Sequence, residues 1–341
     1  MRKATDFAIY LSKFFMDYLP YERNSSKNTI RSYKDTFVQF VDYMEKIKCV
    51  RIEKLSLDIL SKDAIRSFLR YLNDKKQTSP STHNSRLAAI HSFVRYLQYE
   101  DITRLSQWQD ILSIKFIKSE RAEINHLTPE GIKLLFEQPD IATLAGFRHL
   151  AILSLMYDAG TRVQELADLT VGSIRVDTTP CTIKIIGKGN KARVVPLSLQ
   201  QAERIKDYMK INHLDDSAKV NNPLFFNSRG EKLTRAGITY ILKNYADMAR
   251  TVNPHLIPEK ISCHSLRHSK AMHLLQSGVN IVIIRDFLGH RSIQTTAIYA
   301  RIDSKTKREA LEKTYVDLVP QKTSLREWEH NQDIREWLRR L

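Results

Sequence analysis

The sequence contains little glycine and proline, the residues that most often interrupt helices and form turns. Ten of each occur among its 341 residues, about half of the roughly 12% that the pair makes up in an average protein. So few turn-forming residues favour helices over an architecture of short strands. We therefore expect a mainly α-helical protein, long enough for two domains that each have a core.

Cysteine and long apolar runs are also scarce. The cysteines Cys49, Cys181 and Cys263 are far apart and form no CxxC pair, which argues against a disulfide framework and a cysteine zinc site. No apolar run approaches the roughly 20 residues of a membrane span, and the first residues lack the apolar core of a signal peptide. These absences predict a reducing compartment, either a nucleus or the cytoplasm, where bacterial DNA lies.

Acidic residues are outnumbered by basic ones. The chain has 54 Lys+Arg and 38 Asp+Glu, a net charge of +16. Residues 1–118 hold 21 basic and 13 acidic residues, and residues 119–341 hold 33 and 25. The excess predicts a polyanionic partner, because each neutralised phosphate releases counterions; a basic surface without a partner is the alternative. Since both parts carry the excess, we expect a clamp around a polyanion such as DNA.

The first third of the sequence predicts a bundle of helices. Apolar residues recur at three- and four-residue steps over 26–48 and 63–73, and again after the helix start signal at 79–81. A further helix is expected around 4–18. The polar faces are rich in basic side chains, which suit phosphate contacts but also fit ordinary solvated charge: Arg66, Arg70, Lys75, Lys76, Arg86 and Arg95.

We divide the chain into a helical domain at 1–112, a linker at 113–125 and a second domain at 126–341. The second domain also predicts helices, with one exception. The β-branched runs at 182–186 and 193–197 flank a turn that contains glycine, which predicts a β-hairpin. The expected fold is therefore mainly α, with a small antiparallel β-sheet in the second domain.

Four short patterns in the second domain combine into one chemistry. They are DAGTRVQEL at 158–166, a lysine at the hairpin tip, HSLRH at 264–268, and LGH at 288–290 with a tyrosine nine residues later. Cutting a phosphodiester without a metal requires cations on the phosphate oxygens, an in-line nucleophile and a proton for the leaving oxygen. Each residue alone also fits a structural role, but together they supply this set. The candidates are Arg162, Lys188, His264, Arg267, His290 and Tyr299.

The order Arg…Lys…His-x-x-Arg…His…Tyr, anchored by GTRVQEL, HSLRH and LGHRSIQTTAIY, resembles the tyrosine recombinases, also called the phage integrase family. Within it, the sequence is similar to Xer-like recombinases and to the tyrosine transposases of mobile elements. The resemblance is close over about 127–308. The N-terminal part resembles the family's core-binding, SAM-like domain only in general character.

The resemblance implies a role for each candidate residue. Arg162 and Arg267 would clamp the scissile phosphate, and Lys188 would protonate the departing 5′ oxygen. Tyr299 would attack, leaving a 3′-phosphotyrosyl bond and a free 5′ hydroxyl. Because this bond conserves the energy of the broken strand, the reaction would need neither ATP nor another cofactor, and the side-chain cations of the clamp would take the place of a metal.

Two histidines and one carboxylate complete the implied set. His264 and His290 would donate hydrogen bonds to the phosphate and help to manage the proton of the nucleophile. Glu165 matches an acidic family position that supports the arginine clamp, but it also fits an ordinary carboxylate in the first turn of a helix. Thr161 and Lys270 depart from the family pattern, which affects helix packing or DNA contacts but removes no reactive group.

A third histidine, His268, is expected to be a buried structural residue. A zinc site formed by His264, His268 and His273 is the alternative, since the first two are four residues apart. The HExxH motif would place glutamate where Ser265 stands. We therefore do not favour a metal.

The residues beyond the candidate nucleophile predict helices at 304–315 and 324–341. The second carries an apolar stripe made of Leu325, Trp328, Ile334, Trp337, Leu338 and Leu341. This stripe fits packing against its own domain. In the resembling family, such a segment often docks on the neighbouring protomer.

We therefore expect a site-specific DNA recombinase or integrase, or a tyrosine transposase, that acts on double-stranded recombination sites. It would self-associate into a tetramer on DNA through the C-terminal helix, in the bacterial cytoplasm with the nucleoid. Two other functions are open at this point. One is a type IB topoisomerase, which uses the same chemistry on one duplex, and the other is a non-catalytic DNA-binding regulator on the same fold.

Overall fold

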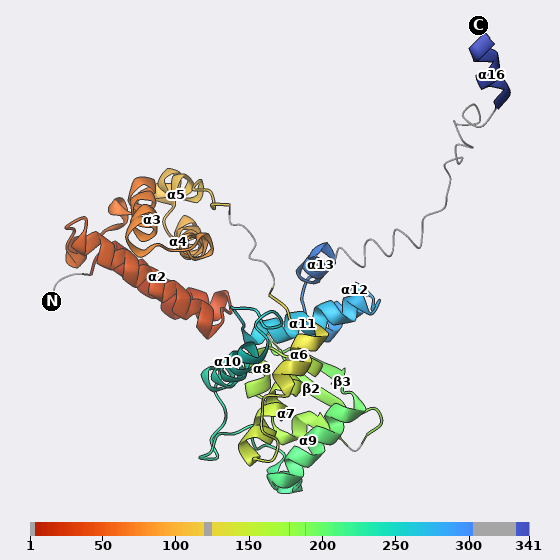
Figure 1. The fold of residues 1–341 in the computed structure, drawn as a ribbon. Helices are drawn as coiled ribbons and strands as arrows, with labels where there is room; N and C mark the ends of the chain where they lie inside the picture. The colour runs from red at the N-terminus through yellow and green to blue at the C-terminus, as the bar shows by residue number, and fades with distance from the viewer. Residues whose placement is uncertain (1–3, 119–124, 177, 188, 303–331, 341) are drawn as a thin grey trace. The chain divides into compact units, whose positions relative to one another are not determined.

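The chain folds into two compact units, Met1–Ala122 and Glu123–Leu341, in the computed structural model (Figure 1). Each unit has its own hydrophobic core. The predicted linker at 113–125 stays a prediction. The structure describes residues 4–118, 125–176, 178–187, 189–302 and 332–340.

The described part of the first unit is helical, as the sequence predicts. Its main elements are α1 (Asp6–Lys13), a π-helical stretch (Phe14–Glu22), α2 (Lys27–Lys46), α3 (Lys62–Lys76), α4 (Pro80–Glu100) and α5 (Leu105–Leu112). Short 3-10 turns lie at Ile52–Lys54, Leu57–Ile59 and Ile102–Arg104. Of these helices, α5 was not expected from the sequence.

Serine side chains start three of these helices. The hydroxyls of Ser26, Ser61 and Ser79 accept hydrogen bonds from backbone N–H groups that have no partner within the helix. Pro80 occupies the first turn of α4, where a missing N–H group costs nothing. The apolar faces of α2, α3 and α4 then meet in a core rich in aromatic rings, including Phe40, which is fully buried.

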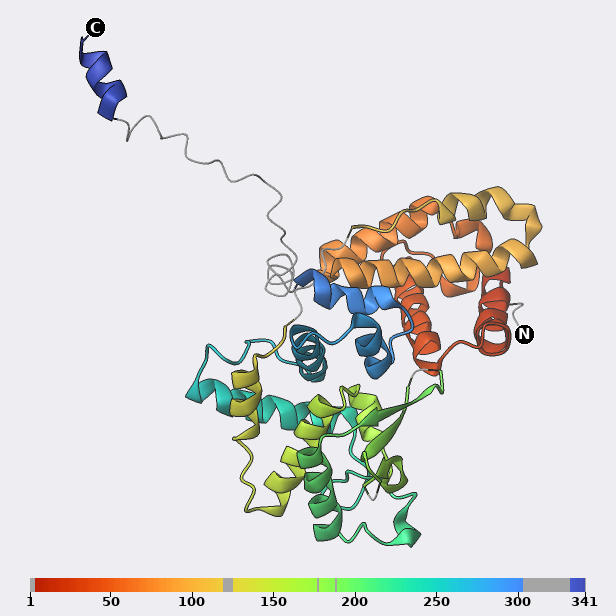
Figure 2. The ribbon, with the colours of Figure 1, turned by 90° about the vertical axis from the view of Figure 1, so that its right-hand side faces the viewer.

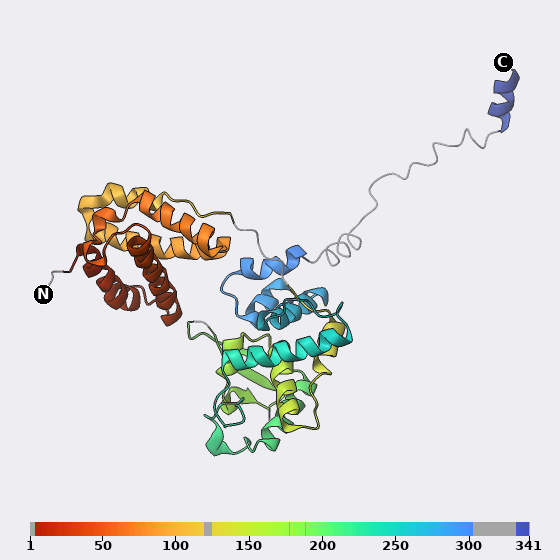
Figure 3. The ribbon, with the colours of Figure 1, turned by 60° about the vertical axis from the view of Figure 1, so that its left-hand side comes forward.

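In the second unit, helices cover one face of a small sheet, whose strands alternate buried and exposed residues. Figure 2 shows α9 beside α7, and Figure 3 shows α12 and α13 on the same side of α10. The helices are α6 (Pro129–Phe136), α7 (Leu144–Asp158), α8 (Val163–Ala167), α9 (Leu199–Ile211), α10 (Arg235–Val252), α11 (Cys263–Gln276), α12 (Ile281–Leu288) and α13 (Ile293–Ile302). Short 3-10 turns lie at Val171–Ser173 and Ser217–Lys219.

The sheet has three antiparallel strands in the order β1 (Ile174–Arg175), β2 (Thr182–Ile186) and β3 (Ala192–Pro196). The hairpin of β2 and β3 confirms the prediction, with the second strand one residue earlier than expected. Ile183 pairs with Val195, and both side chains are buried. Because side chains alternate between the faces of a strand, this pair sets which face meets the core.

Of the predicted C-terminal helix, the structure describes α16 (Gln332–Arg340), which is helical as expected. Ile334 and Leu338 on it are exposed. The helix predicted at 304–315 lies outside the described residues. In the described part of the chain, no helix is both long and apolar enough to span a bilayer.

Candidate active site

The candidate site is built around a buried carboxylate, Glu165, in the first turn of α8. Its Oε2 accepts hydrogen bonds from the backbone N–H of Arg162 (2.9 Å) and from Nη2 of Arg193 (2.8 Å). Its Oε1 accepts one from Nη1 of Arg162 (2.6 Å). Burial alone would raise the pKa of Glu165, but the hydrogen bonds and charges of Arg193 and Arg162 lower it to about 2. Glu165 is therefore ionised at neutral pH and holds two guanidinium groups.

Arg267, on α11, is 2% exposed. Its Nη1 donates to the carbonyl of Gly160 and its Nη2 to the carbonyl of Leu288, both at 2.6 Å. Nη1 also lies 3.9 Å from Oε2 of Glu165. Burial lowers the pKa of Arg267 to about 9, and the charge of Arg162 acts in the same direction. The group stays protonated at neutral pH and joins the α7–α8 turn to the end of α12.

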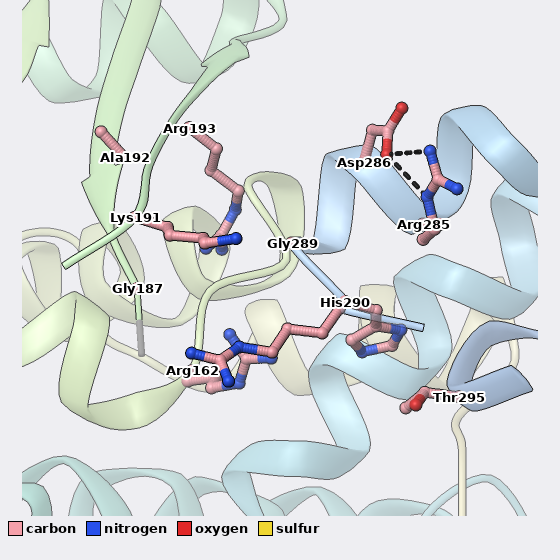
Figure 4. A pocket seen from close by; sticks show the side chains of 11 residues that line it. Arg162, Gly187, Lys191, Ala192, Arg193, Arg285, Asp286, Gly289, His290 and Thr295 are labelled. Carbon is pink, nitrogen blue, oxygen red and sulfur yellow. Dashed lines mark hydrogen bonds and ion pairs between the residues drawn. The ribbon is translucent and has the colours of Figure 1, made fainter. Parts of the chain in front are cut away.

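Beside these groups lies a pocket of about 550 Å³ with a surplus of positive charge (Figure 4). Of the described residues that line it, Asp286 is the one acidic side chain, and it pairs with Arg285. Guanidinium and ammonium groups bind phosphate oxygens through charge-assisted hydrogen bonds, so the pocket suits a phosphate. The lining residues are Arg162, Gly187, Lys191, Ala192, Arg193, Arg285, Asp286, Gly289, His290, Arg291 and Thr295.

Gly289 brings the hairpin and α12 together at this pocket. It ends α12 with φ +66°, a left-handed conformation that glycine adopts without strain. A Cβ at this position would lie 3.1 Å from Cδ of Arg193. The absence of a side chain therefore lets the Arg193 side chain pack against the end of α12, directly before His290.

The two predicted histidines have depressed pKa values. His290 Nδ1 lies 2.9 Å from Oγ1 of Thr296, which is buried. Burial lowers the pKa of His290 to about 4, with Arg267 and Arg162 adding to the effect. His264 is an exposed residue in the otherwise buried first turn of α11, and partial desolvation, Arg267 and Arg162 lower its pKa. Both rings are neutral at pH 7, so each has one donor and one acceptor nitrogen.

Tyr299, on α13, is 1% exposed. Its hydroxyl oxygen lies 2.7 Å from Nδ1 of His268. Burial raises the pKa of Tyr299 to about 12, although the charges of Arg267 and Arg162 oppose the shift. The side chain packs in a small apolar cluster with Leu288 and does not line the pocket. At neutral pH the phenol keeps its proton.

The sequence-predicted residues are thus partly brought together. Arg162, Glu165 and Arg267 are in direct contact or close to it, and His290 lines the same pocket as Arg162. Lys188 lies outside the described residues.

The predicted alternative of a zinc site is not supported by the hydrogen bonds of its members. The ring nitrogens of His273 contact the Tyr157 hydroxyl (2.7 Å) and the Leu127 carbonyl (3.0 Å), and Nδ1 of His268 is engaged by Tyr299. No cluster of three metal-ligating side chains occurs in the part of the chain that the structure describes.

Arg193 was not among the site residues expected from the sequence, although the strand pattern contains a signal for it. Arg193 is two residues from buried Val195 and pairs across the hairpin with buried Ile185. A strand alternates its faces, so position 193 points toward the interior. An inward-facing arginine needs a buried anionic partner, and that partner is Glu165.

Comparison with known proteins finds a matching family model for each of the two units. Residues 125–306 match the model of the phage integrase family, and residues 13–101 match that of the phage integrase N-terminal SAM-like domain. The y4rC integrase/recombinase of Sinorhizobium fredii is 32% identical over 92% of this chain and 93% of its own length. Tyrosine recombinase XerC of Herpetosiphon aurantiacus is 33% identical over 85% of this chain and 90% of its own.

Two solved structures share the fold. XerH recombinase in a post-cleavage complex with palindromic difH DNA has a TM-score of 0.65 at 22% identity, covering 85% of this chain and 81% of its own. The Tn1549 transposon integrase bound to transposon right-end DNA has a TM-score of 0.69 at 14% identity, covering 90% and 98%. Since the family model matches more than half of the sequence, and relatives above 30% identity span most of it, the chain belongs to the phage integrase family, the tyrosine recombinases, and is an enzyme that cleaves and rejoins DNA.

Proposed function

We propose that this chain is a site-specific DNA recombinase in which Tyr299 attacks the scissile phosphate and becomes linked to the 3′ end. The observation that carries the proposal is the arginine pair fixed by Glu165 beside a cationic pocket. Arg162 and Arg267 would neutralise the non-bridging oxygens of the phosphate. Because Glu165 and two backbone carbonyls already hold these groups, little reorganisation is needed when the transition state forms.

The other predicted residues complete the proposed reaction. His264 and His290 would donate hydrogen bonds to the phosphate, as neutral rings with one N–H each. Lys188 would protonate the departing 5′ oxygen. In support, the residue before it, Gly187, lines the pocket, and its N–H donates to the Lys191 carbonyl at 2.8 Å.

The role of Lys188 has a direct test. A 5′-phosphorothiolate substrate needs no general acid, because sulfur leaves as an anion. Lys188→Ala should cleave this substrate at close to the wild-type rate and remain impaired on ordinary DNA, as measured by single-turnover cleavage. Equal impairment on both substrates would contradict an acid role.

The nucleophile is tested with a nicked suicide substrate, from which the cut end diffuses away. The wild-type protein should accumulate a covalent DNA adduct, and peptide mapping should locate it at Tyr299. Tyr299→Phe should bind the same DNA and form no adduct. The adduct should also form in EDTA, since side-chain cations replace a metal. An adduct at another residue would overturn the proposal.

We further propose that the enzyme acts as a tetramer on paired DNA sites, linked by its C-terminal helix. In support, Ile334 and Leu338 are four residues apart on α16, so they share one face, and both are exposed. A chain ending at residue 323 should bind one half-site but lose cooperative filling of the second, seen by gel shift, and lose strand exchange. Full strand exchange by this variant would contradict the role of the helix.

A further inference from the structure

The hydroxyl of Tyr299 has one hydrogen-bond partner among the described residues, and it is His268 rather than a histidine of the predicted set. Tyr299 Oη and His268 Nδ1 are 2.7 Å apart, and the ring centroids 5.7 Å. His290 uses its Nδ1 for Thr296 instead. A separation of 2.7 Å is within the range required for proton transfer between a general base and its substrate group.

Burial restricts where the proton of Tyr299 can go. The side chain is 1% exposed and belongs to a cluster with Met272, Ile284 and Leu288. The hydroxyl therefore has no direct route to bulk water. When its oxygen bonds to phosphorus, the proton can pass directly to the group that the hydroxyl contacts in this structure, and that group is His268.

We propose that His268 is a further catalytic residue, whose Nδ1 takes the proton of Tyr299 as the nucleophile attacks. The inference rests on the proposed role of Tyr299. As the bond from Oη to phosphorus forms, the bond from phosphorus to the 5′ oxygen breaks. The Oη proton goes to His268, and the 5′ oxygen receives a proton from a separate acid, proposed above as Lys188. In rejoining, the 5′ hydroxyl returns its proton to that acid, and His268 returns its own to Tyr299.

Electrostatics make this proton transfer depend on bound phosphate. Burial, together with His264, Arg267 and His126, lowers the pKa of His268 to about 4, whereas burial raises that of Tyr299 to about 12. In the free protein the proton therefore stays on the phenol. During attack the phenol becomes more acidic as its oxygen bonds to phosphorus, and the anionic phosphate offsets the charge of Arg267. His268 then acts as a base only while a phosphate is being attacked.

The test uses His268→Asn in the full-length protein. The Asn oxygen can accept a hydrogen bond near the former Nδ1 position, but it does not take up a proton. If His268 is the base, adduct formation on the suicide substrate should fall roughly 10²–10⁴-fold, the usual contribution of such a group, with DNA affinity and Tm nearly unchanged. A purely structural contact would be rescued by this variant.

A matched control exists on the same helix. His273 Nδ1 contacts the Tyr157 hydroxyl at the same 2.7 Å distance, away from the proposed chemistry. His273→Asn should therefore form the adduct at the wild-type rate. A comparable loss in this variant would assign the effect to disturbed packing of α11.

A second measurement separates proton transfer from positioning. Ring-fluorinated tyrosine at position 299 has a more acidic phenol, so the deficit of His268→Asn should shrink with this nucleophile. An unchanged deficit would make His268 a structural residue, and faster cleavage by His268→Asn would make the contact a restraint on the nucleophile. Either result overturns this inference while an adduct mapped to Tyr299 still supports the proposed function. A wild-type protein without that adduct overturns both.

Discussion

The two units differ in what they bury. In the first, the rings of Phe14, Phe37 and Phe93 contact one another with centroids 5.2 to 6.4 Å apart. In the second, the large core is mainly aliphatic, and the charged groups of Glu165 and Arg267 are buried as well. Aromatic pairs add about 0.5–1.5 kcal/mol each beyond area burial, whereas buried charges are tolerated only while paired. One interior is suited to stability, and the other accepts charges that the chemistry requires.

An ion-pair cluster also exists in the first unit, where Asp101 is buried but water reaches the arginine. Arg104 contacts Asp6, Asp58 and Asp101, and its side chain is 29% exposed, against 3% for Arg267. Water screens the charge of Arg104 and leaves that of Arg267 almost unscreened. Matched substitutions of Arg104 and Arg267 therefore allow the interiors of the two units to be compared.

Among the substitutions that compare the two units, Arg267→Ala should have the largest effect. Single-turnover cleavage should fall by at least the roughly 10²–10³-fold typical of losing one transition-state donor. DNA affinity should fall far less, because other basic residues provide most of the binding. Arg104→Ala should lower the stability of the first unit and leave the cleavage rate of the bound complex unchanged. Similar cleavage losses in both variants would remove the distinction between the clusters.

Glu165→Gln should have an intermediate effect. It leaves Arg162 and Arg193 without their anionic partner while keeping the size of the side chain. A hydrogen bond between charged groups contributes about 1.5–3 kcal/mol, so cleavage should slow roughly 10–100-fold if that amount is lost from positioning. The rate of adduct formation at saturating DNA measures this. An unaffected rate would leave Glu165 as a helix-capping carboxylate only.

The same carboxylate predicts a pH dependence of stability. The pKa of Glu165 falls from 4.5 to about 2 on folding, so its contribution is present above about pH 4.5 and is lost as the pH falls toward 2. Hydrogen exchange in α8 and α11 should accelerate over this range in the wild-type protein. Glu165→Gln should flatten that response; an identical acid response in the variant would contradict the assignment.

The smallest effect is expected for Phe93→Leu in the first unit. Losing its ring contacts with Phe14 and Phe37 should destabilise that unit by roughly 1–3 kcal/mol. Fluorescence of Trp108, which is fully buried there, can follow urea unfolding with the tail tryptophans replaced. Cleavage by the bound complex should not change. A slower chemical step in this variant would mean that the packing of the first unit affects the candidate active site, contrary to this prediction.

The helices and the hairpin could be predicted because their signals are local. Amphipathic spacing, serine caps and β-branched runs depend on a few neighbouring residues. The strand β1 was not predicted because its two residues are too few for periodicity, and the helix α5 was not predicted because it follows a 3-10 turn without a side-chain cap that would mark its start. The candidate site residues could also be identified from the sequence, because they belong to short motifs close to helix starts and turns.

The contacts within the site could not be predicted in the same way. From the sequence, Glu165 could be either an ordinary carboxylate in the first turn of a helix or a support for the arginine clamp. In the structure it caps α8 and pairs with two arginines. His268 was expected to be structural, and it contacts the hydroxyl of Tyr299. These partners lie 28 and 31 residues apart along the chain, so only packing between helices and hairpin brings them together.

The close approach of Gly289 to Arg193 restricts which residues relatives can carry at these two positions. A side chain at 289 would be strained by the left-handed backbone, and its Cβ would lie 3.1 Å from Cδ of Arg193, so that the arginine side chain would have to shift. A shorter residue at 193 would relieve this close contact but deprive Glu165 of one partner. We therefore expect the two positions to change together among relatives, although 96 residues separate them in the sequence. A homologue that has lost the glycine should be found to have replaced the arginine as well, and to neutralise its buried carboxylate by other means.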